Sequence, residues 1–486
     1  MPFVLTWLLW HKASWPVVRH RPHFELVFSL PDQVLATIDS SLGSGRFSLF
    51  IEFVQQWQEW NGVSYDSVMT TQLLWFIALL LAMYFLGRQV ANERVALLAV
   101  AVTALTPAFF GASLEFNDHL MNLTVVAVGL ALFCVERPPL RWLAIAVAGV
   151  VFALDCLSAL VMSNAAIVGI VLSAGLISQE LFRREIEPGK GLLGRFRRAF
   201  LFLLVFWTPA LFALLAVTGQ INIGYFFDQL LHFDAPPFSF GSFIAYFPVT
   251  FLYQLGPAIG LALIIALSAG KRLPIRQKAL LIGSLIAPYL LLSLIGKKTE
   301  WYVLYPLVSG PIIISEALFS LRIRVWRFAA IGLLLIAASA WFSYRITVPR
   351  YVTADPIGHH YNPFGAFERQ IVGYLIPPIT EPDIYMKTAF ALQRLRVRAK
   401  PDTRFDVSII DRFCHAEFLY FIESAAKPTS LTCLDSNPET IQHALHTANV
   451  FVFSTEFITH SDLIPFTNDL TIFASIDNRY LVMTRN

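Results

Sequence analysis

Long uninterrupted runs of apolar residues constrain this chain more than any other feature of its sequence. A bilayer core is about 30 Å thick, and about 20 apolar residues in a helix cross it. Only 14% of the 486 residues are charged, whereas a typical soluble domain carries about 25%. The sequence therefore predicts an all-α polytopic membrane bundle of about ten or more transmembrane helices. The expected spans are 72–87, 95–113, 120–136, 141–157, 163–180, 199–217, 247–269, 279–295, 303–321 and 328–345.

The loops between these runs alternate in charge. One set is short and rich in Lys and Arg, as in 183–198 and 271–278. The other set carries no basic residue except Lys297 and Lys298. Because Lys and Arg are retained on the cytoplasmic side of a membrane, the basic loops are predicted to be cytoplasmic. The second set therefore faces the periplasm or an equivalent lumen, and it comprises 114–119, 158–162, 218–246 and 296–302.

Three regions follow from this topology. Residues 1–71 form an N-terminal segment on the outer face, 72–345 form the transmembrane domain, and 346–486 form a small C-terminal α/β soluble domain on the outer face. Alternating and helical apolar patterns define the elements of the last region. They predict strands at 406–410, 449–454, 470–475 and 479–484, and helices at 383–397, 415–425 and 438–447.

The two ends of the chain add further expectations. Residues 2–10 are apolar but too few to span, so we expect a further span to precede residue 1. Segments 24–38 and 47–60 have the pattern of amphipathic helices that lie in the membrane interface. Cys414 and Cys433 lie in the polar tail, where they would be able to pair if that tail meets an oxidising compartment.

The outer loop before the third predicted span gathers side chains that can carry chemistry. It places Glu115, Asp118 and His119 within five residues. Glu115 and Asp118 share a face if the segment is helical, because residues three apart are neighbours on a helix. Asp118 also lies where a helix N-terminus favours an anion. Two interpretations stay open, a catalytic carboxylate and a simple helix cap.

A later outer loop carries the two basic residues. Lys297 and Lys298 stand against the positive-inside trend, and an anionic partner such as a lipid phosphate would explain them. Lysine offers a point charge to phosphate, and the nearby Tyr302 offers a hydroxyl group. Glu300 lies between them and is a further candidate. The alternative is ordinary snorkelling at a helix end, with Tyr302 in an aromatic belt.

One carboxylate lies inside an apolar run. Asp155 falls within 141–157, and a charge inside a membrane helix usually serves a cavity. Its place near the outer end of the run also fits a partly hydrated residue that snorkels or caps. The sequence has no Walker, GxSxG, HExxH or CxxC motif, which argues against an ATP-driven pump, a serine hydrolase and a zinc protease. No basic tract with interleaved aromatics suggests nucleic-acid binding.

Two runs of the sequence resemble a known family. The run 87–119, GRQVANERVALLAVAVTALTPAFFGASLEFNDH, resembles the second and third spans of the GT-C-fold membrane glycosyltransferases, with Pro107 and Asp118 in the places of the family pattern. That superfamily includes the dolichyl-phosphate-mannose protein mannosyltransferases and the bacterial aminoarabinose transferases. The run 296–317, GKKTEWYVLYPLVSGPIIISEA, is similar to its later lysine, tyrosine and proline segment, and the resemblance covers about 40–345. The residues that fit this later segment are Lys297, Lys298, Tyr302, Pro306 and Pro311.

The resemblance implies an active site on the outer face, a polyprenyl-phosphate sugar donor and a catalytic carboxylate in the first outer loop. The run 39–50, DSSLGSGRFSLF, is similar to a Gly-Arg-Phe segment of some bacterial members, which would set Asp39 and Arg46 near the site. Asp39 would then be the general base, and Asp118 would position the acceptor or hold a divalent cation, Mg²⁺ or Mn²⁺. Without Asp39, Asp118 is the base. The donor phosphate would be bound by Lys297, Lys298 and Tyr302.

The predicted function is therefore transfer of a sugar from a polyprenyl-phosphate donor to a periplasmic lipid, glycan or protein acceptor. We expect the enzyme to lie among the lipids of a bacterial inner membrane. A secondary transporter or a flippase of lipid-linked saccharide is the main alternative, although the sequence shows no internal repeat. A polysaccharide polymerase or ligase typically relies on arginines, and the predicted outer loops between spans contain none. A non-catalytic member of the same fold is the remaining alternative.

Overall fold

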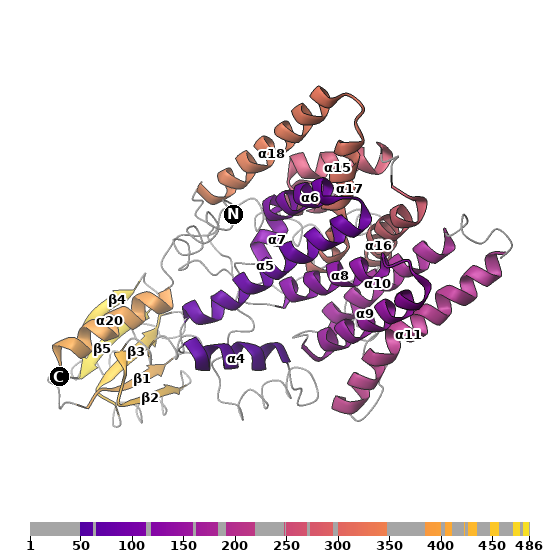
Figure 1. Ribbon diagram of the computed structural model, residues 1–486. Coiled ribbons are helices and arrows are strands. Elements are labelled where there is room, and N and C mark those ends of the chain that lie inside the picture. Colours follow the sequence, from indigo (N-terminus) through magenta and orange to yellow (C-terminus); the bar gives the residue numbers. More distant parts are fainter. Residues whose placement is uncertain are drawn as a thin grey trace. The chain divides into compact units, whose positions relative to one another are not determined.

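The computed structural model divides the described chain into two compact units, a helical unit and a unit built on a sheet (Figure 1). Residues 49–347 contribute to the first unit and residues 384–485 to the second. The residues that the structure describes are 49–61, 65–112, 118–158, 162–182, 191–218, 247, 249–269, 273–294, 300–347, 384–399, 404–410, 422, 426–434, 448–455, 470–476 and 480–485.

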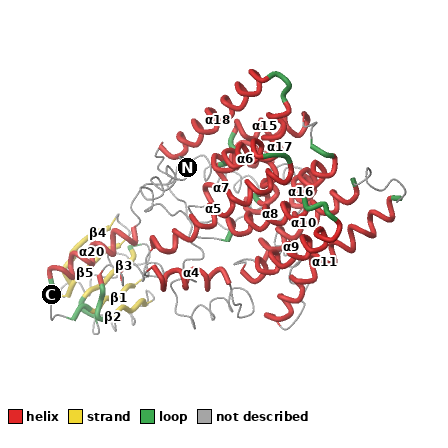
Figure 2. Tube along the Cα trace, in the orientation of Figure 1, coloured by secondary structure: helices red, strands yellow, loops and turns green. Residues whose placement is uncertain are grey.

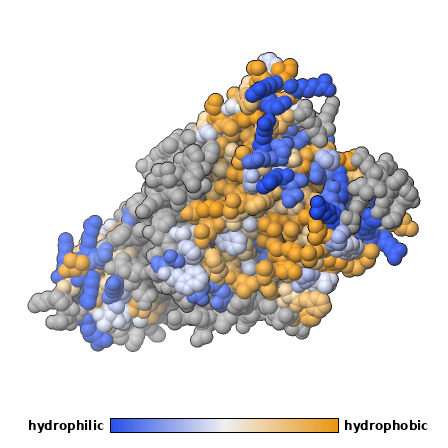
Figure 3. Space-filling model, in the orientation of Figure 1, coloured by the Kyte–Doolittle hydropathy of each residue, from blue (hydrophilic) through white to orange (hydrophobic). Residues whose placement is uncertain are grey.

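Within the described residues of the helical unit, six helices are long and apolar enough to cross a membrane, namely α5, α9, α10, α11, α16 and α18. Large apolar side chains such as Leu81, Phe85, Phe200, Phe212 and Ile336 are exposed on them. Figure 3 shows apolar residues spread over the visible face of this unit. Since such a surface is stable against lipid tails and not against water, the protein is an integral membrane protein.

The described helices of the unit are α4 (Leu49–Asn61), α5 (Tyr65–Val90), α6 (Glu93–Leu105), α7 (Pro107–Ala112), α8 (His119–Phe133), α9 (Pro138–Ser158), α10 (Met162–Leu181), α11 (Leu192–Thr218), the π-helix η2 (Val249–Gln254), α15 (Pro257–Ala269), α16 (Ile275–Leu294), the 3₁₀-helices η3 (Glu300–Val303) and η4 (Tyr305–Ser309), α17 (Gly310–Ser320) and α18 (Arg324–Thr347).

Four of the ten predicted spans differ from a single long helix. The run 95–113 is broken where Thr106 takes an extended conformation before Pro107, since the residue before a proline disfavours the helical region. The run 247–269 is broken at Gly256, whose φ of 77° lies in the left-handed region that favours glycine. The third expected span is α8, which has 15 residues. The run 303–321 begins with the two 3₁₀-helices and becomes α-helical only in α17.

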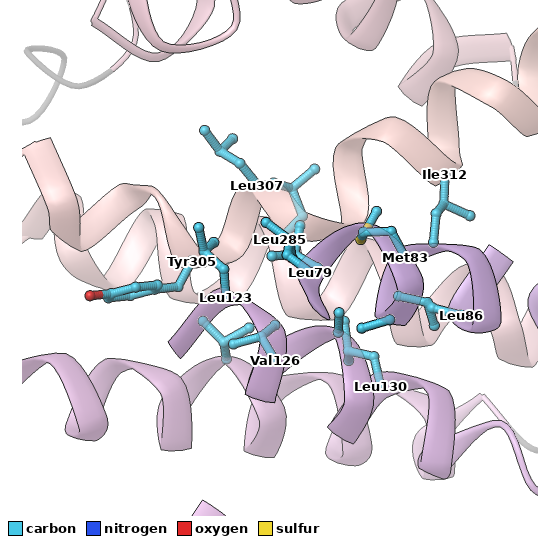
Figure 4. Packing of buried hydrophobic residues seen from close by; sticks show 14 of the residues in the cluster. Leu79, Met83, Leu86, Leu123, Val126, Leu130, Leu285, Tyr305, Leu307 and Ile312 are labelled. Carbon is cyan, nitrogen blue, oxygen red and sulfur yellow. The ribbon is translucent and has the colours of Figure 1, made fainter. Parts of the chain in front are cut away.

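The apolar core joins helices that are distant in the sequence. Figure 4 shows Leu79 and Met83 of α5 beside Leu123 and Val126 of α8, with Leu285 of α16 packed on the same cluster. Burial of these side chains away from water and lipid fixes α8 in the middle of the bundle. The ends of α8 therefore lie inside the protein.

Helices α9 and α11 approach closely at a glycine. A Cβ atom added to Gly149 would lie 2.4 Å from the carbonyl oxygen of Phe206, so the two backbones meet in a space that no side chain fits. The Phe152 and Phe206 rings stack one turn further along, with their centroids 5.2 Å apart. This contact holds α9 firmly along its middle and fixes the positions of its two ends.

The second unit is a five-stranded sheet covered by α20 (Ile384–Arg398) (Figures 1 and 2). The strand order is β2-β1-β3-β5-β4; β1 pairs in parallel with β2 and β3, and β5 pairs antiparallel with β3 and β4. The predicted α/β domain is thereby confirmed. The strands are β1 (Asp406–Ile410), β2 (Ser430–Leu434), β3 (Val450–Ser454), β4 (Leu470–Ile476) and β5 (Tyr480–Arg485).

The expectations for the polar regions of the sequence have mixed outcomes. The expected helix at 47–60 is α4, and the expected helix at 383–397 is α20. The predicted helices at 24–38 and 438–447 lie outside the described residues, as does most of 415–425. Cys433 is disulfide-bonded, whereas Cys134 and Cys156 are buried thiols. The expected partner of Cys433, Cys414, lies outside the described residues.

Candidate active site

Asp118 lies at the start of α8, inside the bundle, and is only 1% exposed. It occupies the N-cap position, yet its side chain makes no capping hydrogen bond to the helix. Instead its Oδ1 accepts a hydrogen bond from Nδ2 of Asn164, at 3.0 Å, across the gap to α10. Simple helix capping therefore does not account for this carboxylate, and the interpretation of Asp118 as a site residue is favoured.

Tyr305 links the start of α8 to the segment that follows the two predicted phosphate-binding lysines. Its hydroxyl lies 2.7 Å from Nδ1 of His119 and accepts a hydrogen bond from Nδ2 of Asn122 at 3.2 Å. All three side chains are buried. In Figure 4 the Tyr305 hydroxyl points away from the labelled apolar side chains. Because Nδ1 of His119 also lies 3.7 Å from Oδ1 of Asp118, the tyrosine belongs to the same polar group as the aspartate.

Asp155 contributes a second carboxyl group near the far end of α9. It is 1% exposed, so the expectation of a partly hydrated residue is wrong. Neither of its carboxyl oxygens has a hydrogen-bond partner in the described part of the chain. Asp155 interacts electrostatically with Asp118 and Tyr305 through the buried interior, which places all three in one region of the bundle.

These residues form what we call the aspartate cluster. Its members come from the start of α8, the end of α9, the start of α10 and η4, because α8, α9 and α10 run alternately up and down. A carboxylate fixed by an amide can take a proton from a bound hydroxyl group, provided that the hydroxyl comes within hydrogen-bond reach. The cluster comprises Asp118, His119, Asn122, Asp155, Asn164 and Tyr305.

The described residues contain no group of three or more His, Cys, Asp or Glu side chains that could hold a metal ion. A divalent cation at Asp118 therefore stays a prediction. Asp118 and Asn164 alone offer two oxygen ligands, and Mg²⁺ bound by so few protein groups would depend on water or substrate phosphate for the rest of its octahedral shell.

The other predicted site residues fall in two groups. Tyr302 is buried in η3, and it interacts electrostatically with Tyr305, while Glu300 begins the same short helix. The rest lie outside the described residues, and the sequence positions concerned are Asp39, Arg46, Glu115, Lys297 and Lys298.

Sequence reasoning missed three members of the cluster, Asn122, Asn164 and Tyr305. Asn122 lies one helical turn after Asp118, so helical spacing was a signal for it. Tyr305 lies three residues after Tyr302, and nothing in the sequence distinguishes which of these two tyrosines reaches His119. Asn164 begins a different helix and carries no local signal.

Comparisons with known proteins bear on this geometry. The family described as dolichyl-phosphate-mannose-protein mannosyltransferase matches residues 53–195, from α4 into α11. The crystal structure of ArnT from Cupriavidus metallidurans bound to undecaprenyl phosphate matches with a TM-score of 0.61 and 13% identity, and it covers 99% of this chain and 97% of that one. The chain has a GT-C fold. This confirms the resemblance noted from the two sequence runs.

Two further GT-C structures were compared. ArnT from the same organism in the apo state has a TM-score of 0.59 at 13% identity, over 99% of this chain and 96% of that one. The oligosaccharyltransferase AglB from Archaeoglobus fulgidus, in complex with an inhibitory peptide and a dolichol-phosphate, has a TM-score of 0.48 at 11% identity, over 94% and 69% of the two chains. No curated protein sequence matches the chain. At these identities the likeness is one of GT-C fold, so the reaction has to be argued from the site.

Proposed function

We propose that this protein is a glycosyltransferase that moves a sugar from a polyprenyl-phosphate donor to a periplasmic lipid, glycan or protein acceptor. The observation that carries the proposal is the buried Asp118, which is held by Asn164 instead of capping its own helix. The His119–Tyr305 contact then joins this carboxylate to the chain segment that directly follows Lys297 and Lys298. This contact supports a site that combines the Asp118 carboxylate with the segment in which we expect the donor phosphate to bind.

The proposed reaction assigns separate roles to Asp118 and to the loop that carries Lys297 and Lys298. In the reaction, the acceptor oxygen forms a bond to the anomeric carbon of the sugar while the bond from that carbon to the phosphate oxygen breaks. Asp118 takes the proton of the acceptor hydroxyl as general base, and the polyprenyl phosphate leaves with the negative charge. Lys297 and Lys298 are the expected partners of that phosphate, and they would offset the charge that develops on it.

The fold supports a lipid-linked donor. The matching ArnT structure contains undecaprenyl phosphate, and its likeness covers nearly the whole of both chains. The exposed apolar faces of α11 and α18 offer surface for a polyprenyl tail within the membrane. A soluble sugar nucleotide would not need its enzyme to be placed in a bilayer, whereas a polyprenyl donor does.

Two observations support an outer-face site. Arg141 at the start of α9 and Arg276 at the start of α16 lie at the end of the bundle away from the aspartate cluster, as the positive-inside trend predicts for a site on the outer face. The disulfide at Cys433 fits an oxidising compartment for the C-terminal unit, since the cytosol keeps thiols reduced. A bacterial inner membrane with a periplasmic site accommodates both.

The proposal is tested by measuring transfer from radiolabelled polyprenyl-phosphate sugars in membranes that contain the wild type or Asp118→Asn. We expect the variant to lose transfer by about 100-fold or more, since general base catalysis contributes 10² to 10⁴ in rate. Glu136→Gln is the matched control, because it makes the same carboxylate-to-amide change at the opposite end of α8. That control should keep wild-type transfer.

Two results would count against the proposal. Full transfer by Asp118→Asn would keep the enzyme class and move the essential carboxylate to the first outer loop, where Asp39 is the candidate. Absence of transfer from every donor tested, with folded wild-type protein in the membrane, would favour a non-catalytic relative of the same fold.

A further inference from the structure

The feature that the proposed reaction leaves unexplained is the carboxyl group of Asp155. It lies inside an apolar helix, it is 1% exposed, and neither oxygen has a hydrogen-bond partner among the described residues. Burial of a carboxyl group without partners costs folding free energy. Such a carboxyl group either lowers the stability of the folded protein or gains its hydrogen bonds when a ligand binds.

A second acceptor in the same cluster is also incomplete. Asn122 is fully buried, and its Nδ2 donates to Tyr305, yet its Oδ1 has no partner in the described structure. Three buried oxygens of the cluster therefore have no hydrogen-bond partner among the described residues, two on Asp155 and one on Asn122. This part of the site lacks groups that hydrogen-bond to these oxygens.

The kind of ligand follows from this shortage. A carboxyl group and an amide oxygen both accept hydrogen bonds from neighbouring hydroxyl groups. A sugar carries hydroxyl groups on adjacent carbons, each of which donates one hydrogen bond.

We propose that Asp155 and Asn122 form the sugar-recognition subsite of the enzyme, which accepts hydrogen bonds from hydroxyl groups of the sugar on the lipid donor. This inference rests on the proposed function, and it assigns the step that selects the sugar and not the step that transfers it. Asp155 interacts electrostatically with Asp118, so the sugar would be bound beside the base.

A ligand role and a structural role for Asp155 predict opposite changes in stability. If Asp155 held the bundle together, its replacement would destabilise the empty protein. If it is kept for a ligand, Asp155→Leu removes an unpartnered polar group and fills the same space with apolar atoms. We therefore expect this variant to unfold at a temperature about 2 °C or more above that of the wild type in the absence of lipid.

The experiment compares binding and stability in the purified full-length protein. Equilibrium binding is measured for undecaprenyl phosphate and for undecaprenyl-phosphate glucose, galactose and mannose. The wild type should bind at least one sugar-bearing lipid about tenfold or more tightly than undecaprenyl phosphate, as a pair of buried hydrogen bonds contributes. Asp155→Leu should lose that difference and bind undecaprenyl phosphate as the wild type does, and Glu136→Gln should match the wild type in both.

Two outcomes would overturn the inference while leaving the proposed function standing. One is a wild type that binds every sugar-bearing lipid no more tightly than undecaprenyl phosphate. The other is an Asp155→Leu variant that unfolds at a lower temperature and still discriminates between the lipids, which would make Asp155 a structural residue. A wild type that binds none of the four lipids would overturn the proposed function itself, and the inference with it.

Discussion

Two polar clusters lie at opposite ends of the same three helices, and they are built in contrasting ways. The aspartate cluster occupies the start of α8, the end of α9 and the start of α10. On α9, Arg141 and Asp155 are 14 residues apart, which is about 21 Å along a helix. We call the opposite group the arginine cluster, and its members are Glu136, Arg141, Gln179, Glu180 and Arg276.

The arginine cluster pairs its charges. Arg141 is 2% exposed; its Nη2 donates to Glu180 and, at 3.1 Å, to the amide oxygen of Gln179. Its guanidinium also lies 5.0 Å from the ring centroid of Phe202. Two other guanidinium nitrogens of Arg141 have no partner among the described residues, but the charge itself is balanced by Glu180.

The aspartate cluster instead gathers two carboxyl groups with no Lys or Arg among its members. A buried charge with its counter-charge in place is satisfied within the protein, whereas a buried carboxyl group without partners costs folding free energy until a ligand completes it. The comparison teaches that one end of α8, α9 and α10 satisfies its charges internally, and that the other end, where we propose the chemistry, does not. We therefore expect substitutions in the arginine cluster to change stability and not transfer activity, and substitution of Asp118 in the aspartate cluster to change transfer activity.

The largest expected effect on stability is at Glu180. Glu180→Gln leaves the buried Arg141 without its counter-charge, and breaking one side of a buried pair costs about 3–5 kcal/mol. The unfolding midpoint in detergent should fall by several degrees, and less folded protein should be recovered. Transfer per folded molecule should stay at the wild-type value, since the change lies at the end of α10 away from Asp118.

The paired variant Glu180→Gln/Arg141→Met sharpens this prediction. Removing both charges leaves no unpaired ion, so the double variant should recover most of the lost stability. A Glu180→Gln protein that kept its unfolding midpoint and lost transfer would break the comparison, because it would give the arginine cluster a role in function.

A middle-sized effect is expected within the aspartate cluster, at Tyr305. Tyr305→Phe removes the hydroxyl that His119 and Asn122 share, and a buried group left unsatisfied costs about 1–3 kcal/mol. Stability should therefore decrease here, whereas Asp155→Leu increases it. The two substitutions lie in one cluster. They distinguish the Tyr305 hydroxyl, which has hydrogen-bond partners within the protein, from the Asp155 carboxyl, which has none among the described residues.

Tyr84→Phe on α5 is the matched control for this measurement. The Tyr84 ring packs against the ring of Phe85, and this contact does not need the hydroxyl group. Thermal unfolding of Tyr305→Phe and Tyr84→Phe should be followed side by side. Equal midpoints for the two variants would show that the Tyr305 hydroxyl does not hold η4 to α8.

The sequence predicted the general fold well and the cluster only in part, for a physical reason. Apolar runs and basic loops reveal spans and their direction because the bilayer imposes length and charge rules residue by residue. The contact between Asp118 and Asn164 joins residues 46 apart, and that between His119 and Tyr305 joins residues 186 apart. Neither spacing follows any local period, so only packing of the helices brings these side chains together.

Errors in the predicted elements have equally specific causes. Hydropathy over 95–113 ignores the backbone, so it missed the break at Thr106, although Pro107 was visible as a signal for it. Strand β2 was missed because it lies at the edge of the sheet and has no fully buried residue, so its sequence lacks the apolar run that marks the fully buried β3. Asp155 was identified because a carboxylate inside an apolar run is unusual on its own.

The smallest expected effect lies in the arginine cluster itself, at Glu136. This carboxylate accepts a hydrogen bond from Arg276 at 3.3 Å, but its side chain is 55% exposed, in contrast to the 1% of Glu180. Water and lipid headgroups can replace an exposed partner, so Glu136→Gln should cost about 0–1 kcal/mol. Thermal unfolding of Glu136→Gln and Glu180→Gln in the same detergent measures the difference. If both variants lost equal stability, burial of an ion pair would not determine how much that pair contributes to the stability of the bundle. The two clusters would then differ in their charges and not in how burial makes those charges matter.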